Sequence, residues 1–310
     1  MEIFENVLLS RYSNYRIGGP ALYFTEPKTK EDIVGAISWA KYKKIPLFVL
    51  GGGTNIIFRD KGFPGLVVRP MLQQISIRDT TAIAGSGVLM HDLLSRVASH
   101  SLSGLEWAGG LPGMLGGAIR GNAGAFGGEI KDVVEEVTSL AFYGEHPEII
   151  VRKNAVCEFG YRTSVFKKAA DKEIILSAVL HLTRGNPHSI RESVHEKIRF
   201  RHDRHPMDYP NIGSIFKNIP VASVSEQVQK KFEFALKTDP FPVIPAAVVI
   251  AALGFRGARK GGAIVSRKHP NFIVNAKNAA ASDVRELIEL IKAKTLKEFG
   301  ISLEEEVLYV

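Results

Sequence analysis

The stretch "GGLPGMLGGAIRGNAGAFGG" (109–128) is dense in glycine, yet Leu111, Met114, Ile119 and Phe126 are threaded through it. So many glycines disfavour a helix, and so many apolar side chains disfavour a flexible linker. Glycine here predicts unusual backbone angles and a close approach of the main chain to a ligand.

A second glycine loop lies upstream, in "VLGGGTNIIF" (49–58). A strand followed by Gly-Gly-Gly-Thr-Asn presents successive backbone N–H groups to a phosphate. The loop is not a P-loop, because no Gly-Lys-Ser/Thr follows, and it is not the G-x-G-x-x-G fingerprint with a later acidic residue. Alone, it is equally well explained as a simple turn. Two glycine loops that each follow apolar, strand-like sequence suggest one long, phosphate-bearing cofactor that is gripped twice.

Helices and strands are both expected along the chain, which indicates an α+β protein. Apolar spacing and end signals predict helices at Thr29–Lys43, 91–99, 188–206, in a short segment between Pro245 and Gly254, and from Ser282 to Gly300. Short apolar runs predict strands at 45–50, 65–70, 81–88, 134–143, 173–184, 271–275 and 301–310. The polar helix 188–206 is expected to lead into the last domain.

The net charge of +8 is compatible with two classes of partner. A nucleic-acid-binding protein is one of them. However, the basic residues are spread along the chain, without a Lys/Arg-rich run or interleaved aromatic residues. The charge therefore favours anionic small molecules, such as phosphorylated substrates and cofactors, and no nucleic acid partner is expected.

The chain has a single cysteine, Cys157, which excludes an internal disulfide and any multi-cysteine zinc site. We expect it to be a small buried hydrophobe, and we expect no metal. The N-terminal residues show no signal peptide. The most apolar stretch, "PFPVIPAAVVIAALGF" (240–255), is too short to span a membrane and carries three prolines. A cytoplasmic protein without membrane insertion is expected.

Seven stretches carry a resemblance to a known family. They are "YRIGGPA" (15–21), "LGGGTNIIF" (50–58), "GLPGMLGGAIRGNAGAFGGEI" (110–130), "FGYRTSVFK" (159–167), "NIGSIFKN" (211–218), "GGAIVSRKHPNFIVN" (261–275) and "LEEEV" (303–307). Their order and coverage of nearly the whole chain resemble the UDP-N-acetylenolpyruvoylglucosamine reductase family, flavoenzymes of peptidoglycan precursor synthesis. A shorter form of the family is indicated, because the interval between Arg162 and Ser214 leaves no room for the inserted tyrosine loop of the longer form.

The resemblance implies non-covalent FAD in a two-part flavin domain of the vanillyl-alcohol oxidase type, with NADPH as reductant. The parts would be residues 1–75 and 76–195, followed by a smaller α/β substrate domain at 196–310. The positions implied to bind FAD are Gly51, Gly52, Gly53, Thr54, Asn55, Gly110, Pro112, Gly113, Gly116, Gly117, Asn122, Ala123 and Gly124.

The family's reaction reduces the enolpyruvyl ether of a UDP-sugar to a lactyl ether. Hydride reaches the terminal carbon, negative charge spreads onto the carboxylate as an enediolate, and a proton must reach the carbon between. The resemblance assigns Arg162 to the carboxylate, which a guanidinium can grip bidentately. It assigns Glu306 to the enediolate and Ser214 to proton donation.

Three further positions, Tyr161, Lys217 and Asn218, resemble substrate contacts, and Lys217 is expected to meet the nucleotide diphosphate. Strand alternation would place Glu304 and Glu306 on one face. It would leave Glu305, where the family pattern has proline, as a solvated strand end. A hydroxy-acid oxidase or dehydrogenase on the same flavin fold is the alternative enzyme. It would share the glycine loops but leave "NIGSIFKN" and "LEEEV" unexplained.

Overall fold

The computed structural model describes residues 1–144, 146–169, 172–238 and 241–310, so Pro240 of the apolar stretch lies outside the described residues. The chain divides into two compact units. Unit 1 comprises Met1–Val7, Ala21–Gly52 and Pro64–Arg201, and unit 2 comprises Leu8–Pro20, Gly53–Phe63 and His202–Val310. Unit 2 therefore contains two segments from the first seventy residues. The division of the flavin part at residue 75 stays a prediction.

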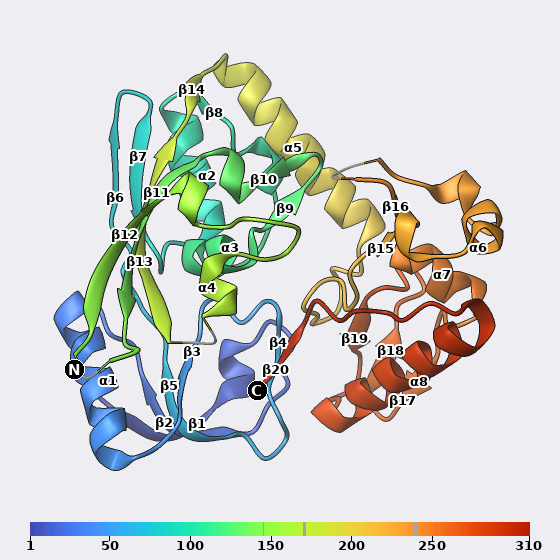
Figure 1. The fold of residues 1–310 in the computed structure, drawn as a ribbon, viewed down its shortest axis with the longest axis horizontal. Coiled ribbons are helices and arrows are strands. Elements are labelled where there is room, and N and C mark those ends of the chain that lie inside the picture. Colours follow the sequence, from blue (N-terminus) through green and yellow to red (C-terminus); the bar gives the residue numbers. More distant parts are fainter. Residues whose placement is uncertain (145, 170–171, 239–240) are drawn as a thin grey trace. The chain divides into compact units, whose positions relative to one another are not determined.

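Unit 1 is built on a four-stranded sheet of order β1-β2-β5-β3 and a five-stranded antiparallel sheet of order β12-β11-β13-β7-β6 (Figure 1). Its strands are β1 (Phe4–Leu8), β2 (Pro20–Thr25), β3 (Leu47–Val49), β5 (Phe63–Val68), β6 (Ile75–Arg78), β7 (Thr81–Gly85), β8 (Leu102–Ser103), β9 (Gly124–Ala125), β10 (Gly128–Glu129), β11 (Val134–Ala141), β12 (Glu148–Lys153), β13 (Glu173–His181) and β14 (Thr183–Arg184). Its helices are α1 (Lys30–Lys43), α2 (Met90–Ser99), α3 (Leu115–Gly121), α4 (Val165–Lys168) and α5 (Pro187–Arg204), whose last residues belong to unit 2.

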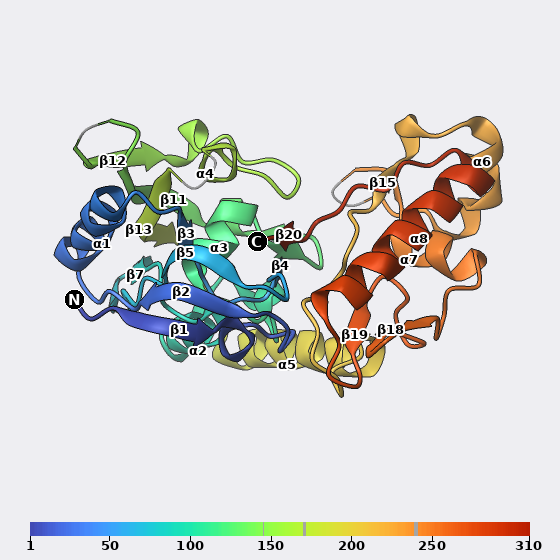
Figure 2. The same cartoon turned by 90° about the horizontal axis from the view of Figure 1, so that it is seen from below.

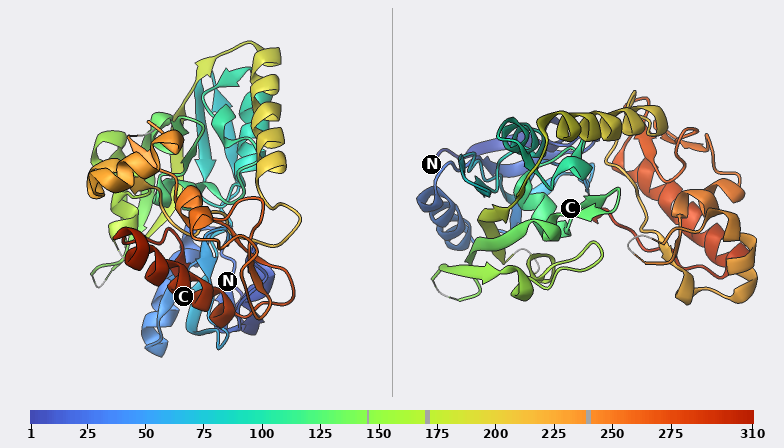
Figure 3. Two further views of the ribbon diagram at one scale, coloured as in Figure 1. Left: turned by 90° about the vertical axis from the view of Figure 1, so that its right-hand side faces the viewer. Right: turned by 90° about the horizontal axis from the view of Figure 1, so that it is seen from above.

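Local signals set the ends of the first helix. The Thr29 side chain accepts the Asp32 N–H at 3.1 Å, and Lys44 ends α1 in a left-handed conformation with φ 55°. Ile33, Ile37 and Ala40 are buried, as the helical spacing predicts. Below this helix β1 and β2 run side by side (Figure 2). The predicted helix 188–206 is confirmed as α5, a straight helix (Figure 3).

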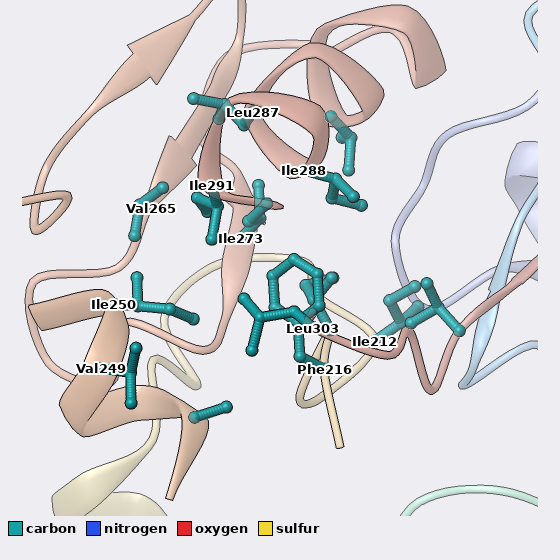
Figure 4. Close-up of a cluster of buried hydrophobic side chains, with 14 of the residues drawn as sticks. Ile212, Phe216, Val249, Ile250, Val265, Ile273, Leu287, Ile288, Ile291 and Leu303 are labelled. Atoms are coloured by element: carbon teal, nitrogen blue, oxygen red, sulfur yellow. The ribbon is translucent and has the colours of Figure 1, made fainter. Parts of the chain in front are cut away.

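Unit 2 surrounds its own apolar core. Its strands are β4 (Ile56–Ile57), β15 (Ile219–Pro220), β16 (Val243–Ile244), β17 (Arg259–Lys260), β18 (Ala263–Val265), β19 (Ile273–Asn275) and β20 (Leu308–Tyr309), and its helices are α6 (Glu226–Lys231), α7 (Ala246–Ala252) and α8 (Ala281–Phe299). In the core, Val249 and Ile250 of α7 lie with Leu287, Ile288 and Ile291 of α8 (Figure 4). This core is what holds "NIGSIFKN" in place, since Ile215 and Phe216 belong to it.

The two N-terminal segments of unit 2 are integral to it. The Tyr15 hydroxyl donates to the Ile273 carbonyl at 2.8 Å, and the Asn275 amide donates to the Tyr15 carbonyl at 3.0 Å. Farther along, β4 pairs in parallel with β20. The last residues of the chain are thus fixed by residues near position 56.

Two expectations about secondary structure are wrong. The glycine-rich stretch 109–128 contains the helix α3, because its apolar residues Leu115, Ala118 and Ile119 are buried in the core of unit 1. The expected strand 301–310 is strand only at Leu308–Tyr309, with a single isolated bridge farther back, between Glu305 and Phe216. Within the described ranges, every helix is too short or too polar to cross a lipid bilayer.

Candidate active site

The two glycine loops meet inside unit 1. A Cβ atom added to Gly52 would lie 2.7 Å from the Cα of Gly113, and one added to Gly51 would lie 3.8 Å from Gly117. A Cβ atom at Gly117 itself would meet nothing within 4 Å. The main chains of the loops therefore touch where glycine permits it, with open space beside Gly117. This supports the prediction that both loops serve one ligand.

A buried hydroxyl lies beside these loops. The Gly116 N–H donates to the Ser86 carbonyl at 2.9 Å, and Ser86 is 6% exposed. Among the described residues the Ser86 Oγ atom has no hydrogen-bond partner. Buried polar groups are nearly always paired in native proteins, so a hydroxyl left over here fits a site completed by a ligand.

The second half of the first loop belongs to unit 2. Gly53 has φ 64°, and a side chain there would collide with the Tyr12 carbonyl. Thr54 is half-buried, whereas Asn55 is exposed and its amide donates to the backbone carbonyl of Glu306 at 3.0 Å. Glycine is thus required at Gly53 by both its angle and its surroundings.

The remaining predicted cofactor positions differ in exposure. Pro112 is exposed, Gly110 has φ 71°, and Ala123 packs against the core of unit 1. Asn122 is fully buried; its amide donates to Glu129 and to the Gly160 carbonyl, while its side-chain oxygen accepts the Lys131 N–H. The Asn122 side chain therefore ties the end of α3 to the turn at Gly160.

Arg162 lies on that turn. The backbones of Gly160 and Thr163 pair at 3.1 and 3.2 Å, and Arg162 between them has φ 57°. Its Nη2 atom donates to the Gly124 carbonyl at 2.8 Å, and its guanidinium lies 5.3 Å from the Tyr161 ring centroid. The structure thus brings Arg162 and Tyr161 to the glycine-rich segment. A left-handed conformation at arginine is uncommon and is concentrated at functional sites.

Ser214 and Glu306, which are distant in sequence, are neighbours in unit 2. The Glu306 N–H donates to the Ile215 carbonyl at 2.8 Å, and the Lys217 N–H donates to the Glu304 carbonyl at 2.9 Å. Asn271 fixes the serine segment by exchanging side-chain hydrogen bonds with the backbone of Phe216. Ser214 is half-buried, and its hydroxyl donates to no other described residue. Two of the three predicted catalytic residues therefore share one small framework.

The acidic run is arranged differently from the prediction. Glu304 has 70% of its side chain exposed and pairs with Lys217, while Glu305 is 19% exposed and pairs with Lys292 at 2.7 Å. The prediction of a solvated Glu305 is wrong, because α8 supplies it with a cation. Asn218 accepts the Ala246 N–H with its side-chain oxygen at 3.3 Å, at the start of α7.

Sequence reasoning missed Arg201, on α5. Its Nε atom donates to the Gly109 carbonyl at 2.8 Å, and burial lowers the pKa of its guanidinium. Among the described residues its Nη2 atom has no partner, although it is buried. The guanidinium also lies 5.2 Å from the Phe126 ring centroid. The helix α5 contains many basic residues, and the sequence has no signal that distinguishes Arg201, which contacts the glycine-rich segment, from the others.

No group of three His, Cys, Asp or Glu side chains suited to a metal ion occurs in the part of the chain that the structure describes. Cys157 is fully buried, as predicted, and burial raises the pKa of its thiol to about 11.

Two family models match the chain. Residues 21–146 match an FAD binding domain, and residues 205–310 match the C-terminal domain of UDP-N-acetylenolpyruvoylglucosamine reductase. These matches confirm the predicted α+β fold with a flavin domain followed by a smaller domain.

Relatives match over nearly the full length. UDP-N-acetylenolpyruvoylglucosamine reductase from Caldanaerobacter subterraneus subsp. tengcongensis is 35% identical over 308 residues, covering 99% of this chain and 93% of that protein. The enzyme of the same name from Syntrophomonas wolfei is 36% identical, covering 97% and 93%. The crystal structure of the Thermus caldophilus reductase aligns with a TM-score of 0.78 at 29% identity, with full coverage of both chains. The chain belongs to the UDP-N-acetylenolpyruvoylglucosamine reductase family of FAD-dependent oxidoreductases.

Proposed function

We propose that this protein uses NADPH to reduce the enolpyruvyl ether of UDP-N-acetylglucosamine enolpyruvate to UDP-N-acetylmuramate in the cytoplasm. The family membership supports the reaction class. The observation that carries the assignment of residues is the pairing of Ile215 with Glu306, which sets Ser214 beside the carboxylate-bearing residue within one unit.

The residues present fit FAD. Backbone contact between Gly52 and Gly113, and the buried Ser86 hydroxyl without a partner among the described residues, make a cradle in which a side chain would have no room. Bound there, FAD supplies the hydride that it receives from NADPH. The backbones of Gly51–Asn55, Gly110–Gly117 and Asn122–Gly124 are the proposed contacts. The proposed attachment is non-covalent, and Cys157, the single thiol of the chain, is buried away from such a role.

Three side chains are proposed to act on the charged groups of the substrate during the reaction. Arg162 holds the substrate carboxylate. Its left-handed backbone conformation is uncommon for arginine, and its guanidinium donates to the Gly124 carbonyl beside the proposed cofactor contacts. Glu306 acts at the enediolate, and Ser214 gives its proton to the carbon between carboxylate and terminal carbon. A serine in this role needs no nucleophilic activation, only a hydroxyl within reach of that carbon.

Substrate contacts are proposed for Tyr161, Lys217 and Asn218. Lys217 has 17% of its side chain exposed and lies against Glu304. An ammonium held in this way is available to a nucleotide diphosphate if the anion displaces Glu304, which is far more exposed.

The test separates the two half-reactions in anaerobic stopped-flow absorbance. In Ser214→Ala, bleaching of the flavin band by NADPH should match the parent, because that step needs no proton on substrate carbon. Recovery of the band after addition of the enolpyruvyl nucleotide should slow about 10²- to 10⁴-fold, the usual contribution of general acid catalysis. Ser214→Cys should recover part of the rate, since a thiol also donates a proton.

Ser223→Ala is the matched control, because Ser223 is an exposed serine of unit 2 whose hydroxyl donates to the nearby Pro220 carbonyl at 2.7 Å. Parental recovery of the band in Ser214→Ala would remove Ser214 from the mechanism. A parent protein that does not oxidise NADPH in the presence of the enolpyruvyl nucleotide would refute the function itself.

A further inference from the structure

The peptide groups on both sides of Glu306 are anchored. On one side, its N–H donates to the Ile215 carbonyl at 2.8 Å. On the other, its carbonyl accepts the Nδ2 atom of Asn55 at 3.0 Å. The neighbours Leu303 and Val307 are buried, at 4% and 8% exposure, so Glu306 lies between two apolar anchors. Its backbone has little freedom left.

Asn55 makes this contact from the start of a short parallel ladder. Its own carbonyl accepts the Leu308 N–H at 3.1 Å, and the ladder continues with Ile56 opposite Leu308 and Ile57 opposite Tyr309. The Asn55 side chain adds one more hydrogen bond before the first pair of this ladder, because its amide donates to the backbone carbonyl of Glu306. Asn55 is therefore bound to both residue 306 and residue 308.

We propose that Asn55 is a positioning residue for Glu306, acting through the peptide group that follows it. The inference rests on the proposed role of Glu306 at the enediolate. With the amide in place, the peptide plane between Glu306 and Val307 is fixed, and with it the direction in which the carboxylate leaves the backbone. Without it, that plane is held only by the distal ladder, and a displacement of about 1 Å costs roughly 100-fold in rate.

The chemistry of the contact requires a donor of this size. A carbonyl oxygen accepts only from a donor, so the amide nitrogen of Asn55 must face it. Aspartate has the same shape but presents oxygens, so it would repel the Glu306 carbonyl. Glycine-loop backbone amides remain free for cofactor phosphates, because the contact uses only the side chain.

The experiment combines Asn55→Asp, Glu306→Gln and the double variant, each purified with FAD. Because the backbone of Gly51–Asn55 is a proposed FAD contact, Asn55→Asp is assayed with FAD in excess, and its rates are expressed per bound flavin. Its kcat should fall about 100-fold with little change in KM. In Glu306→Gln, adding Asn55→Asp should cost no further rate, because both act on one group. Amide hydrogen exchange in peptides covering 304–308 should be faster in Asn55→Asp.

The matched control is Asn154→Asp. The Asn154 amide in unit 1 also donates to backbone carbonyls, those of Lys131 and Val134, at 2.7 and 2.6 Å. This variant should lower the melting temperature yet keep kcat and the exchange of 304–308, which separates general destabilisation from positioning.

Three results would overturn the inference. A parental kcat per bound flavin in Asn55→Asp would show that the side chain does not position Glu306 for catalysis, and unchanged exchange in 304–308 would show that it does not hold Glu306. Faster exchange together with a fully active Glu306→Gln would show that the contact is real but that the proposed role of Glu306 is wrong.

Discussion

At the scale of single residues, three left-handed backbone conformations lie in or beside the glycine-rich segment. Asn122, Phe126 and Arg162 have φ of 42°, 54° and 57°, all in the left-handed region. Each such residue costs about 1–3 kcal/mol unless its surroundings impose the conformation. Here hydrogen bonds from Asn122 to Gly160 and from Arg162 to Gly124 bind the strained residues to one another's segments. These bonds hold Asn122 and Arg162 in the left-handed conformation.

Gly52→Val should yield a folded protein with little bound FAD. The first added carbon already lies 2.7 Å from Gly113 Cα, so the loops must separate where the cofactor is proposed to bind. Flavin absorbance per protein after purification measures the effect. Gly144→Val, at a glycine whose added carbon would meet nothing within 4 Å, is the control. Full flavin content in Gly52→Val would contradict the cradle.

Glu306→Gln should lower kcat far more than it raises KM, because its interaction grows as charge develops on the substrate. Glu304→Gln should keep most of kcat, since Glu304 is largely exposed and reaches only Lys217. Steady-state kinetics on both variants provide the check. An inactive Glu304→Gln beside an active Glu306→Gln would mean that the two residues have been exchanged in our assignment.

At the scale of elements, the sequence was informative where the signal is local. Thr29 at the start of α1 and Gly300 at the end of α8 mark helices that the sequence predicted. It was misleading at α3, where burial of Leu115 and Ile119 overrides the poor helix propensity of glycine. It was misleading again in the last ten residues, whose pairing partners come from two distant segments, Asn55–Ile57 and Ile215–Lys217. No local pattern reveals such partners.

Asp60 caps α8 from a distant part of the chain. The N-cap position of α8 is Ala280, which has no side-chain acceptor, and the Asp60 carboxylate instead accepts the N–H groups of Ala281 and Ser282 at 2.7 and 3.1 Å. Asp60→Ala should destabilise the protein by about 1–2 kcal/mol, the usual worth of a cap with a favourable helix dipole. Thermal unfolding compared with Asp203→Ala, an exposed aspartate of α5, is the measurement. Equal melting temperatures would show that Asp60 is dispensable as a cap.

At the scale of the whole molecule, the two units are not consecutive in the chain. Unit 2 takes Leu8–Pro20 and Gly53–Phe63 from within the first part of the sequence. The boundaries implied by the resemblance divide the chain into consecutive parts, whereas a unit built from separate segments leaves no mark at any single position of the sequence. The motifs were still found, since each lies in one short segment. What the sequence could not show is that Asn55 and Glu306 share a hydrogen bond.

Tyr15→Ala should weaken unit 2 selectively. The ring is fully buried in the core of unit 2, and its loss should cost about 3–5 kcal/mol, as for other large aromatic truncations. Hydrogen exchange should rise in 202–310 and stay near parental in 64–201. Tyr42→Ala, at a side chain in unit 1 that is 81% exposed, should change neither. A uniform rise over both units would contradict the division.

The interleaving of the units has a consequence for synthesis on the ribosome. Unit 1 has all of its residues once Arg201 has emerged, so it can fold while the chain is still growing. Leu8–Pro20 and Gly53–Phe63 emerge early and bond to each other, as between the Asn14 N–H and the Gly53 carbonyl, but their partners Ile273 and Leu308 are made much later. Through most of translation, apolar residues of these segments such as Tyr15 and Ile57 are therefore exposed, because the rest of the unit 2 core has not yet been made. These segments are where a chaperone would bind, and the proposed catalytic pair of Ser214 and Glu306 forms last of all.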